Sequence, residues 1–234
     1  MTRTMRIIPV LDLKGGIVVH ARRGRRAEYA PLRSPLVDGC EPVAVARALC
    51  AACQTTDLYV ADLDALGGDP VDEATLTALA SVAEPWVDAG ATTPERSAAL
   101  ARAGVARNVV GTESLGPGVQ PDSFTTQQLV LSVDLRDGRL ISPDPSLAGR
   151  LPAAAAPMAQ TMAVREVLVI DLARVGSGAG PPLEAVAELS AALPEAAIFA
   201  GGGVRNADDL RALESAGAAG ALVATALHEG RLTP

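Results

Sequence analysis

Short apolar runs alternate along the chain with longer stretches whose apolar residues recur at helical spacing. In the short runs Val, Ile and Leu follow one another instead of alternating with polar residues, which is typical of parallel strands buried on both faces. The pattern predicts strands near residues 6–11, 57–61, 85–87, 107–110, 129–133, 165–170, 196–200 and 219–224. It predicts helices near residues 41–54, 71–83, 94–103, 151–161, 183–192 and 207–216.

The strand ends occur twice in the same order. Asp12-Leu-Lys-Gly-Gly16 corresponds to Asp134-Leu-Arg-Asp-Gly138, residues 58–67 correspond to 167–176, and residues 88–112 correspond to 201–225. Each half, approximately 1–118 and 127–234, would leave two open sheet edges that the other half can close. The repeat therefore predicts a single α/β domain over residues 1–234, a (β/α)8 TIM barrel of two half-barrels. An open doubly wound sheet, the alternative, does not predict this repetition.

Two regions depart from the regular alternation. Gly, Pro and Ser interrupt residues 115–126, so the helix after the fourth strand should be short or distorted. Only about ten residues follow the eighth strand, which predicts a truncated final helix. A missing outer helix would expose apolar surface beside strands eight and one, and we therefore expect a homodimer or higher oligomer.

The amino-acid composition limits the classes of binding partner and the compartment to be expected. A net charge of −7 argues against nucleic acid and anionic membranes, and no apolar run approaches the length of a membrane span. The absence of a signal-peptide core and an odd count of three cysteines favour a cytoplasmic protein. With only two histidines and no Cys/His cluster, we expect no metal site.

Asp12 and Asp134 are the candidate catalytic pair. They end strands one and five, which lie opposite each other in an eight-stranded barrel, so both side chains can face one substrate. Two carboxyl groups in different environments suffice for general acid–base isomerisation, with no metal or cofactor. One aspartate alone would more often be a loop cap, but two at repeat-related strand ends favour chemistry. The same argument applies more weakly to Asp62 and Asp171 as substrate-binding residues.

The second half carries a candidate phosphate site. Gly201, Gly202 and Gly203 follow strand seven, and Ala224 and Thr225 follow strand eight. Unhindered backbone N–H groups in these loops favour an anion, and such barrels commonly hold phosphate there. A lone glycine triplet would more often be a tight turn, but this placement favours phosphate binding.

The motif order resembles the barrels of histidine biosynthesis, namely the ProFAR isomerase and the cyclase subunit of imidazole glycerol phosphate synthase. The resemblance rests on residues 7–19, 201–209 and 223–230 and covers nearly the whole chain. It implies that Asp12 and Asp134 are the general acid–base pair. Lys14 and the arginines that follow strand one, represented by Arg22, are further candidates for substrate binding. A Schiff-base role for Lys14 is a less favoured alternative, because the residue is expected in a loop.

The first half departs from that family. Where the isomerase has a second glycine triplet for another phosphate, this chain has Asp88-Ala89-Gly90, and the family's Asp-Gly-Thr element after strand six is replaced by residues 174–178. A carboxylate at Asp88 would repel a phosphate dianion. We therefore expect a paralogue that binds a singly phosphorylated substrate, with Asp88 near its other end.

Two hypotheses follow from these patterns. The first is an enzyme that isomerises a singly phosphorylated sugar or aminosugar in the Amadori manner, or performs related acid–base or lyase chemistry. Its resemblance to paralogues of methanogens and methylotrophs implies a part in one-carbon cofactor metabolism. The alternative is a non-catalytic barrel that binds a phosphometabolite and serves a partner protein. Such a binding module would not need both Asp12 and Asp134.

Overall fold

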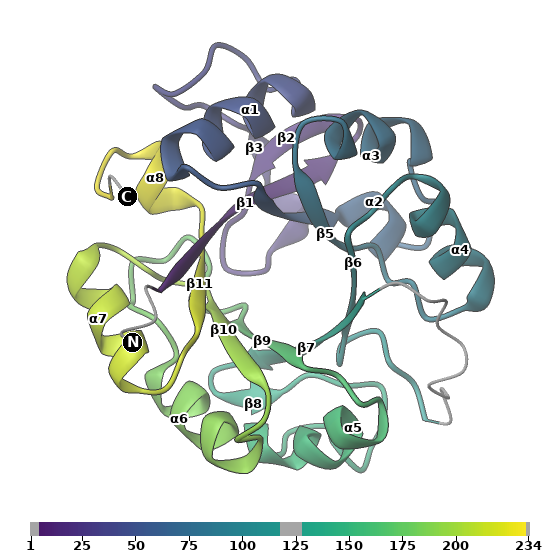
Figure 1. Cartoon of the computed structure of the whole chain (residues 1–234), viewed down its shortest axis with the longest axis vertical. Helices are drawn as coiled ribbons and strands as arrows, with labels where there is room; N and C mark the ends of the chain where they lie inside the picture. Colours follow the sequence, from purple (N-terminus) through teal and green to yellow (C-terminus); the bar gives the residue numbers. More distant parts are fainter. Residues whose placement is uncertain (1–4, 118–127, 233–234) are drawn as a thin grey trace.

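Eight parallel strands form a closed ring, and the predicted (β/α)8 barrel is confirmed (Figure 1). The structure is a computed structural model and describes residues 5–117 and 128–232. Pairing between the first and last strands of the ring closes the barrel. The strands are β1 (Arg6–Lys14), β4 (Asp57–Asp62), β5 (Glu84–Asp88), β6 (Arg107–Gly111), β7 (Gln128–Arg136), β9 (Glu166–Asp171), β10 (Ala197–Gly201) and β11 (Gly220–Val223).

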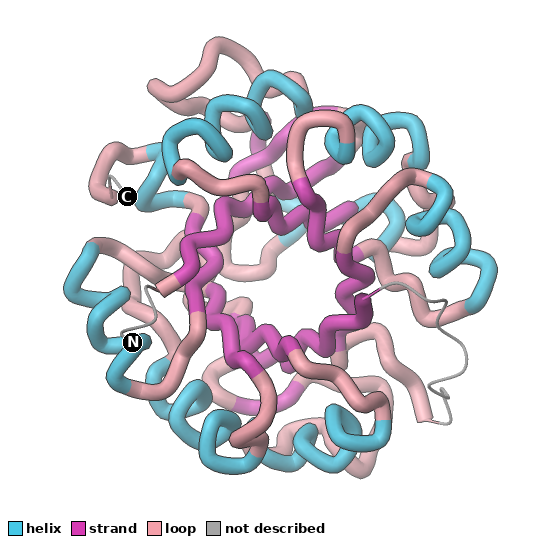
Figure 2. The backbone as a smooth tube through the Cα atoms, in the orientation of Figure 1, coloured by secondary structure: helices cyan, strands magenta, loops and turns pink. Residues whose placement is uncertain are grey.

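The helices lie outside the ring of strands (Figure 2). They are α1 (Pro42–Cys53), α2 (Leu63–Leu66), α3 (Glu73–Ala80), α4 (Pro94–Arg102), α5 (Ala156–Thr161), α6 (Leu183–Ala192), α7 (Ala207–Ser215) and α8 (Thr225–His228). The short α2 is an addition to the predicted set. The helix predicted near 151–161 begins as a 3-10 helix at Pro152–Ala155 before α5. In the described part of the chain no helix is long and apolar enough to cross a membrane.

Two strands run further than predicted, at the same place in each half. β1 continues into a hairpin with β2 (Ile17–His20), and β7 continues into one with β8 (Arg139–Leu140). Both turns hold two residues with positive φ, Gly15 and Gly16 in one, Asp137 and Gly138 in the other. Positive φ at both positions is the type I′ geometry that suits a two-residue hairpin. Lys14 is therefore the last residue of β1, and its assignment to a loop was wrong.

The structure tests only one of the two regions that were predicted to be irregular. Most of the region predicted to be distorted, residues 118–126, lies outside the described residues. The predicted short final helix is α8, with four residues. The apolar flank expected beside it is not seen among the described residues, because Ala226, Leu227 and Leu232 are buried. Exposed apolar surface beside α8 therefore gives no ground to expect oligomerisation. The homodimer stays an untested prediction.

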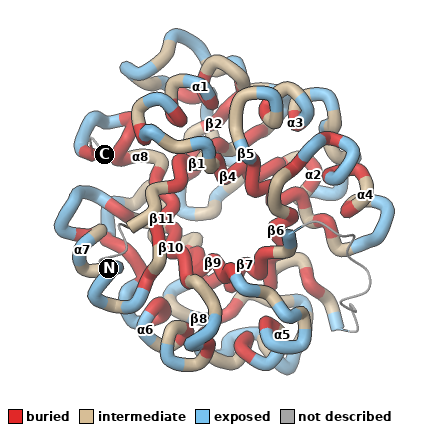
Figure 3. The backbone as a smooth tube through the Cα atoms, in the orientation of Figure 1, coloured by how far each residue is buried: buried red, intermediate tan, exposed pale blue. Residues whose placement is uncertain are grey.

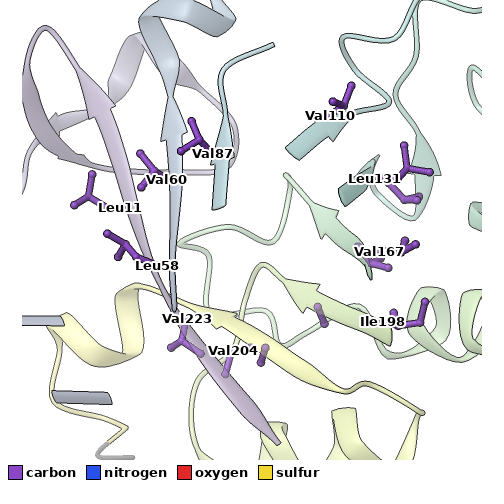
Figure 4. Close-up of a cluster of buried hydrophobic side chains, with 14 of the residues drawn as sticks. Leu11, Leu58, Val60, Val87, Val110, Leu131, Val167, Ile198, Val204 and Val223 are labelled. Carbon is purple, nitrogen blue, oxygen red and sulfur yellow. The ribbon is translucent and has the colours of Figure 1, made fainter. Parts of the chain in front are cut away.

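The hydrophobic core has two layers. In Figure 3 the buried residues follow the ring of strands. The outer layer lies between the strands and the helices, with Leu11, Val60, Val110 and Leu131 among its members (Figure 4). The inner layer fills the barrel itself with side chains such as Ile8. Leu, Val and Ile can fill both layers with few aromatic residues because each strand alternates its side chains between the two faces.

A charged and aromatic plug closes the amino end of the barrel. Arg6 and Arg107 form ion pairs with Asp57 and Glu166, the first residues of β4 and β9. The guanidinium group of Arg107 lies 4.3 Å from the centre of the Trp86 ring. Trp86 in turn meets Phe199 edge to face, with ring centres 5.1 Å apart. Asp57 and Glu166 are repeat-related, as are Trp86 and Phe199, so the repeat extends to this end of the barrel.

Candidate active site

A cavity of about 280 Å³ lies at the carboxyl ends of the strands. It brings together most of the residues that the sequence singled out from both halves of the chain. Its lining includes Asp12, Asp88, Asp134, Gly201, Gly202, Gly203, Ala224 and Thr225. Parallel strands of a barrel deliver their last residues to one mouth, which explains why positions so distant in sequence meet here.

Asp134 is held rigidly in this cavity. Its side chain accepts hydrogen bonds from Ser132 Oγ at 2.6 Å and from the backbone N–H of Glu113 at 3.1 Å. Its own backbone N–H donates to Thr112 Oγ1 at 2.9 Å. A Cβ at Gly111 would collide with the Asp134 carboxylate, so this position requires glycine. Burial raises the pKa of Asp134 well above its usual value, and the charges of Asp88 and Glu113 add to the effect.

Asp12 faces the same cavity from β1 in a different environment. Its side chain accepts no hydrogen bond from the described residues. Burial raises the pKa of Asp12 to about 7, an effect that the nearby Arg26 guanidinium partly opposes. A carboxyl group with this pKa exchanges its proton near neutral pH. The two predicted catalytic aspartates therefore meet in one cavity with different hydrogen-bonding environments.

Asp88 brings a third carboxyl group into the site. Its side chain is 3 % exposed and accepts a hydrogen bond from the backbone N–H of Gly90 at 3.2 Å. An Asp88 oxygen and the Asp134 carboxylate both lie within 4 Å of the point where a Cβ on Gly111 would stand. Burial is the main cause that raises the pKa of Asp88 to about 7, and Arg26 again opposes it.

The sequence did not single out Arg26 and Glu113. Both line the cavity, where the Arg26 guanidinium forms an ion pair with the Glu113 carboxylate. Lys14 Nζ donates to the Arg26 backbone carbonyl at 2.7 Å, so Lys14 anchors the segment that carries Arg26. The arginine-rich composition pointed to this segment, but only its path through β2 and a 3-10 helix at Arg26–Glu28 decides which arginine turns inward. Arg22 and Lys14 lie outside the cavity lining.

Asp62 and Asp171 also lie outside the cavity lining and cap loops instead. Asp62 accepts a hydrogen bond from the backbone N–H of Ala65 at 3.0 Å, at the start of α2. Asp171 accepts from the backbone N–H groups of Gly138 at 3.1 Å and Ala173 at 3.1 Å. These contacts match the loop-cap alternative, and substrate binding by Asp62 and Asp171 stays a prediction.

The glycine loop after β10 has the geometry of an anion site. Gly202 and Gly203 have φ of +93° and +85°, and a Cβ on Gly202 would lie 2.7 Å from a backbone carbonyl oxygen. Within the described parts of the chain, the N–H groups of Gly202, Gly203, Ala224 and Thr225 donate to no acceptor. All four residues are half-buried and line the cavity, so their N–H groups are available to an external acceptor such as phosphate.

The fold and site together define a (β/α)8 barrel of repeated halves, with two opposed carboxyl groups and a loop of unpaired amides at one mouth. A family profile for histidine biosynthesis proteins matches residues 6–233. The chain belongs to this family.

Several relatives are named as isomerases. A ProFAR isomerase of Rubrobacter xylanophilus is 36% identical, across 97% of this chain and 93% of the relative. A ProFAR isomerase of Acidithiobacillus ferrooxidans is 30% identical, across 97% of this chain and 96% of its own. An uncharacterised protein of Methanocaldococcus jannaschii is 28% identical, across 97% of this chain and 95% of its own. The family likeness thus includes both named isomerases and an archaeal paralogue.

Proposed function

We propose that this protein is an acid–base isomerase that acts on a singly phosphorylated aminosugar. One observation carries the proposal: two carboxyl groups with raised pKa values, Asp12 and Asp134, face the same cavity as the unpaired amides of the glycine loop. The amides would hold the phosphate while the carboxyl groups act on the sugar. The names of the isomerase relatives support the reaction class.

Asp134 would act as the general acid. Burial raises the pKa of Asp134 well above the usual carboxyl value, which favours the protonated form that a general acid needs, and Ser132 and Glu113 fix its orientation. It donates its proton to the ring oxygen of the aminosugar as the bond between that oxygen and C1 breaks. The nitrogen lone pair on C1 forms a double bond to carbon, which gives an open-chain iminium ion and leaves Asp134 as a carboxylate.

Asp12 would act as the general base. With a pKa of about 7 it is substantially ionised at neutral pH and can remove the proton from C2 of the iminium ion. The electrons of the C2–H bond form a C1–C2 double bond, and the nitrogen becomes a neutral amine. This enolamine tautomerises to the aminoketose, and the two aspartates regain their starting protonation states by proton exchange. The net reaction is an isomerisation that needs no added reactant.

The first half of the barrel supports a substrate with one phosphate. The relatives' enzyme name describes a substrate with two phosphoribosyl groups. Here the Gly90 N–H, which corresponds to that of Gly203, is already bonded to Asp88. An ionised Asp88 about 4 Å from a phosphate dianion would cost several kcal/mol at an effective dielectric constant of about 20. Both features disfavour a second phosphate.

Replacing Asp12 or Asp134 with Asn tests the proposal, because Asn keeps the shape and removes the acid–base function. With the substrate identified from a panel of phosphorylated aminosugars, turnover should fall by at least about a hundredfold in either variant. Binding of ribose 5-phosphate and the melting temperature should not fall. A wild-type protein that binds phosphosugars but isomerises none would support the non-catalytic alternative. A role in one-carbon cofactor metabolism rests on the resemblance alone and stays a prediction.

A further inference from the structure

We propose that His20 recognises the phosphate group of the substrate and takes up a proton when a phosphate monoester dianion binds beside Thr225. This inference rests on the proposed phosphate site and extends it. It assigns a charge-matching role to a side chain that lies outside both the aspartate pair and the glycine loop.

The barrel topology places His20 next to the loop that follows β11. β1 pairs with β11 through its first half and with β2 through its last three residues, so the hairpin extends from the same edge of the barrel. His20 ends β2 and lines the cavity. Its Nε2 atom lies 3.3 Å from Thr225 Oγ1, next to the unpaired amides of Ala224 and Thr225. An anion on those amides would meet the imidazole ring.

Other basic side chains that line the cavity already have partners. Arg26 pairs with Glu113, at the side of the cavity that holds Asp88. Arg231 pairs with Glu229. His228 is buried, and its Nδ1 atom lies 2.9 Å from Ser34 Oγ. Of the described lining residues, His20 is therefore the basic group best placed to balance a dianion.

Burial keeps His20 neutral until an anion arrives. Arg22 on its own segment, and Glu229 and His228 from the end of the chain, face the ring, and the two histidine rings are 6.4 Å apart. Burial lowers the pKa of His20, Arg22 lowers it further, and Glu229 opposes both. Since the pKa starts below 6.5, His20 is mostly neutral at pH 7.5. A dianion in contact with the ring would raise the pKa and draw in a proton.

This linkage gives the site a preference for the doubly charged phosphate. Phosphate monoesters lose their second proton near pH 6, so the dianion predominates above that value. Affinity should then fall as the pH rises from about 7 to 9, because protonating His20 becomes harder. An arginine at this position would hold the same anion without such a pH dependence.

Calorimetric titration of the full chain with ribose 5-phosphate at pH 7.5 tests the inference. Two buffers with different ionisation enthalpies reveal the number of protons taken up on binding. The wild-type protein should take up a measurable fraction of a proton. His20→Gln should bind about tenfold more weakly, because a charge-assisted hydrogen bond is lost, and should take up clearly fewer protons than the wild-type protein. His20→Arg should bind with near wild-type affinity and the same reduced uptake, which also guards against a simple loss of folding. Any uptake that remains in both variants belongs to Asp12 and Asp88, which have pKa values of about 7 and line the same cavity.

His228→Gln is the matched control, because it removes the neighbouring imidazole and should leave proton uptake unchanged. Wild-type binding without proton uptake, or uptake in His20→Gln as large as in the wild-type protein, would overturn the role of His20 while leaving the phosphate site intact. If the wild-type protein fails to bind ribose 5-phosphate even at millimolar concentration, the phosphate site and this inference both fall. Loss of turnover in the Asp12 and Asp134 variants is measured separately and does not depend on His20.

Discussion

The two halves of the barrel have similar backbone turns at the strand ends. They differ in the hydrogen-bond partners of the backbone N–H groups in these turns. In the first half the chain's own groups occupy them: Gly90 N–H donates to Asp88, Thr112 N–H to the Ser132 carbonyl, and Glu113 N–H to Asp134. In the second half the corresponding amides of Gly203 and Thr225 donate to no acceptor within the described residues.

This difference shows how a repeated fold acquires an asymmetric site. The turns are alike, since Gly90 and Gly203 both have positive φ, at +58° and +85°. Two side chains differ: Asp88 stands where the second half has Gly201, and Ala89 where it has Gly202, and of the two only Asp88 carries a group that can accept the loop's hydrogen bond. A carboxylate in place of a glycine satisfies its own loop internally and adds negative charge to the cavity. One half is thereby left to hold an external anion, and the other holds and positions carboxyl groups.

The largest expected effect concerns the catalytic aspartates, one from each half. The rate constant kcat/KM should rise with pH through about 7 as Asp12 loses its proton, close to tenfold per pH unit on the acid side. It should fall again where Asp134 ionises, because the general acid then has no proton to donate; burial raises the pKa of Asp134 well above the usual carboxyl value. A pH–rate profile on the identified substrate measures both limbs. A rate that stays flat from pH 5 to pH 8 would contradict this assignment.

A matched pair of glycine substitutions tests the phosphate asymmetry. A Cβ in Gly203→Ala would collide with the Gly180 carbonyl and distort the loop, so affinity for ribose 5-phosphate should fall by about tenfold or more. In Gly90→Ala the nearest atom to the new Cβ is Leu66 Cδ2, at 3.5 Å, and affinity should stay within about twofold. Titration calorimetry at one pH compares them. Equal losses in both variants would show that the halves bind phosphate alike.

The smallest expected effect is on stability. The folded protein holds the Asp88 proton more tightly than the unfolded chain does, so its stabilising contribution is present below about pH 4 and is lost as the pH rises through about 7. Asp88→Asn removes that loss and should raise the melting temperature at pH 8 by at least about 3 °C, and by less at pH 5.

Asp208→Asn is the control for that measurement, because its side chain is exposed and pairs with Arg211 on the surface. It should change the melting temperature little at either pH. A lower melting temperature for Asp88→Asn at pH 8 would mean that the ionised carboxylate stabilises its loop, and the contrast between the halves would then need a different cause.

The sequence predicted those features that depend on local pattern and on the repeat. Strand positions, the meeting of Asp12 with Asp134, and the glycine loop follow from the order of motifs along the chain. The roles of Arg26 and Glu113 do not, because their ion pair joins segments separated by 87 residues. Lys14 was misplaced because the two-residue hairpin turn after it was treated as a loop. Asp62 and Asp171 cap nearby loops, and the sequence could not separate this from substrate binding, since a buried carboxylate beside a strand end equally serves nearby backbone amides.

The plug at the amino end of the barrel determines how ligands enter and leave. Arg6, Arg107, Trp86 and Phe199 pack together at the amino end, and the cavity lies at the opposite end, where the strands have their carboxyl ends. We therefore expect substrate and product to pass through the same mouth and to occupy the same cavity. Product and substrate therefore exclude each other, and accumulated product should act as a competitive inhibitor whose release can limit the turnover rate.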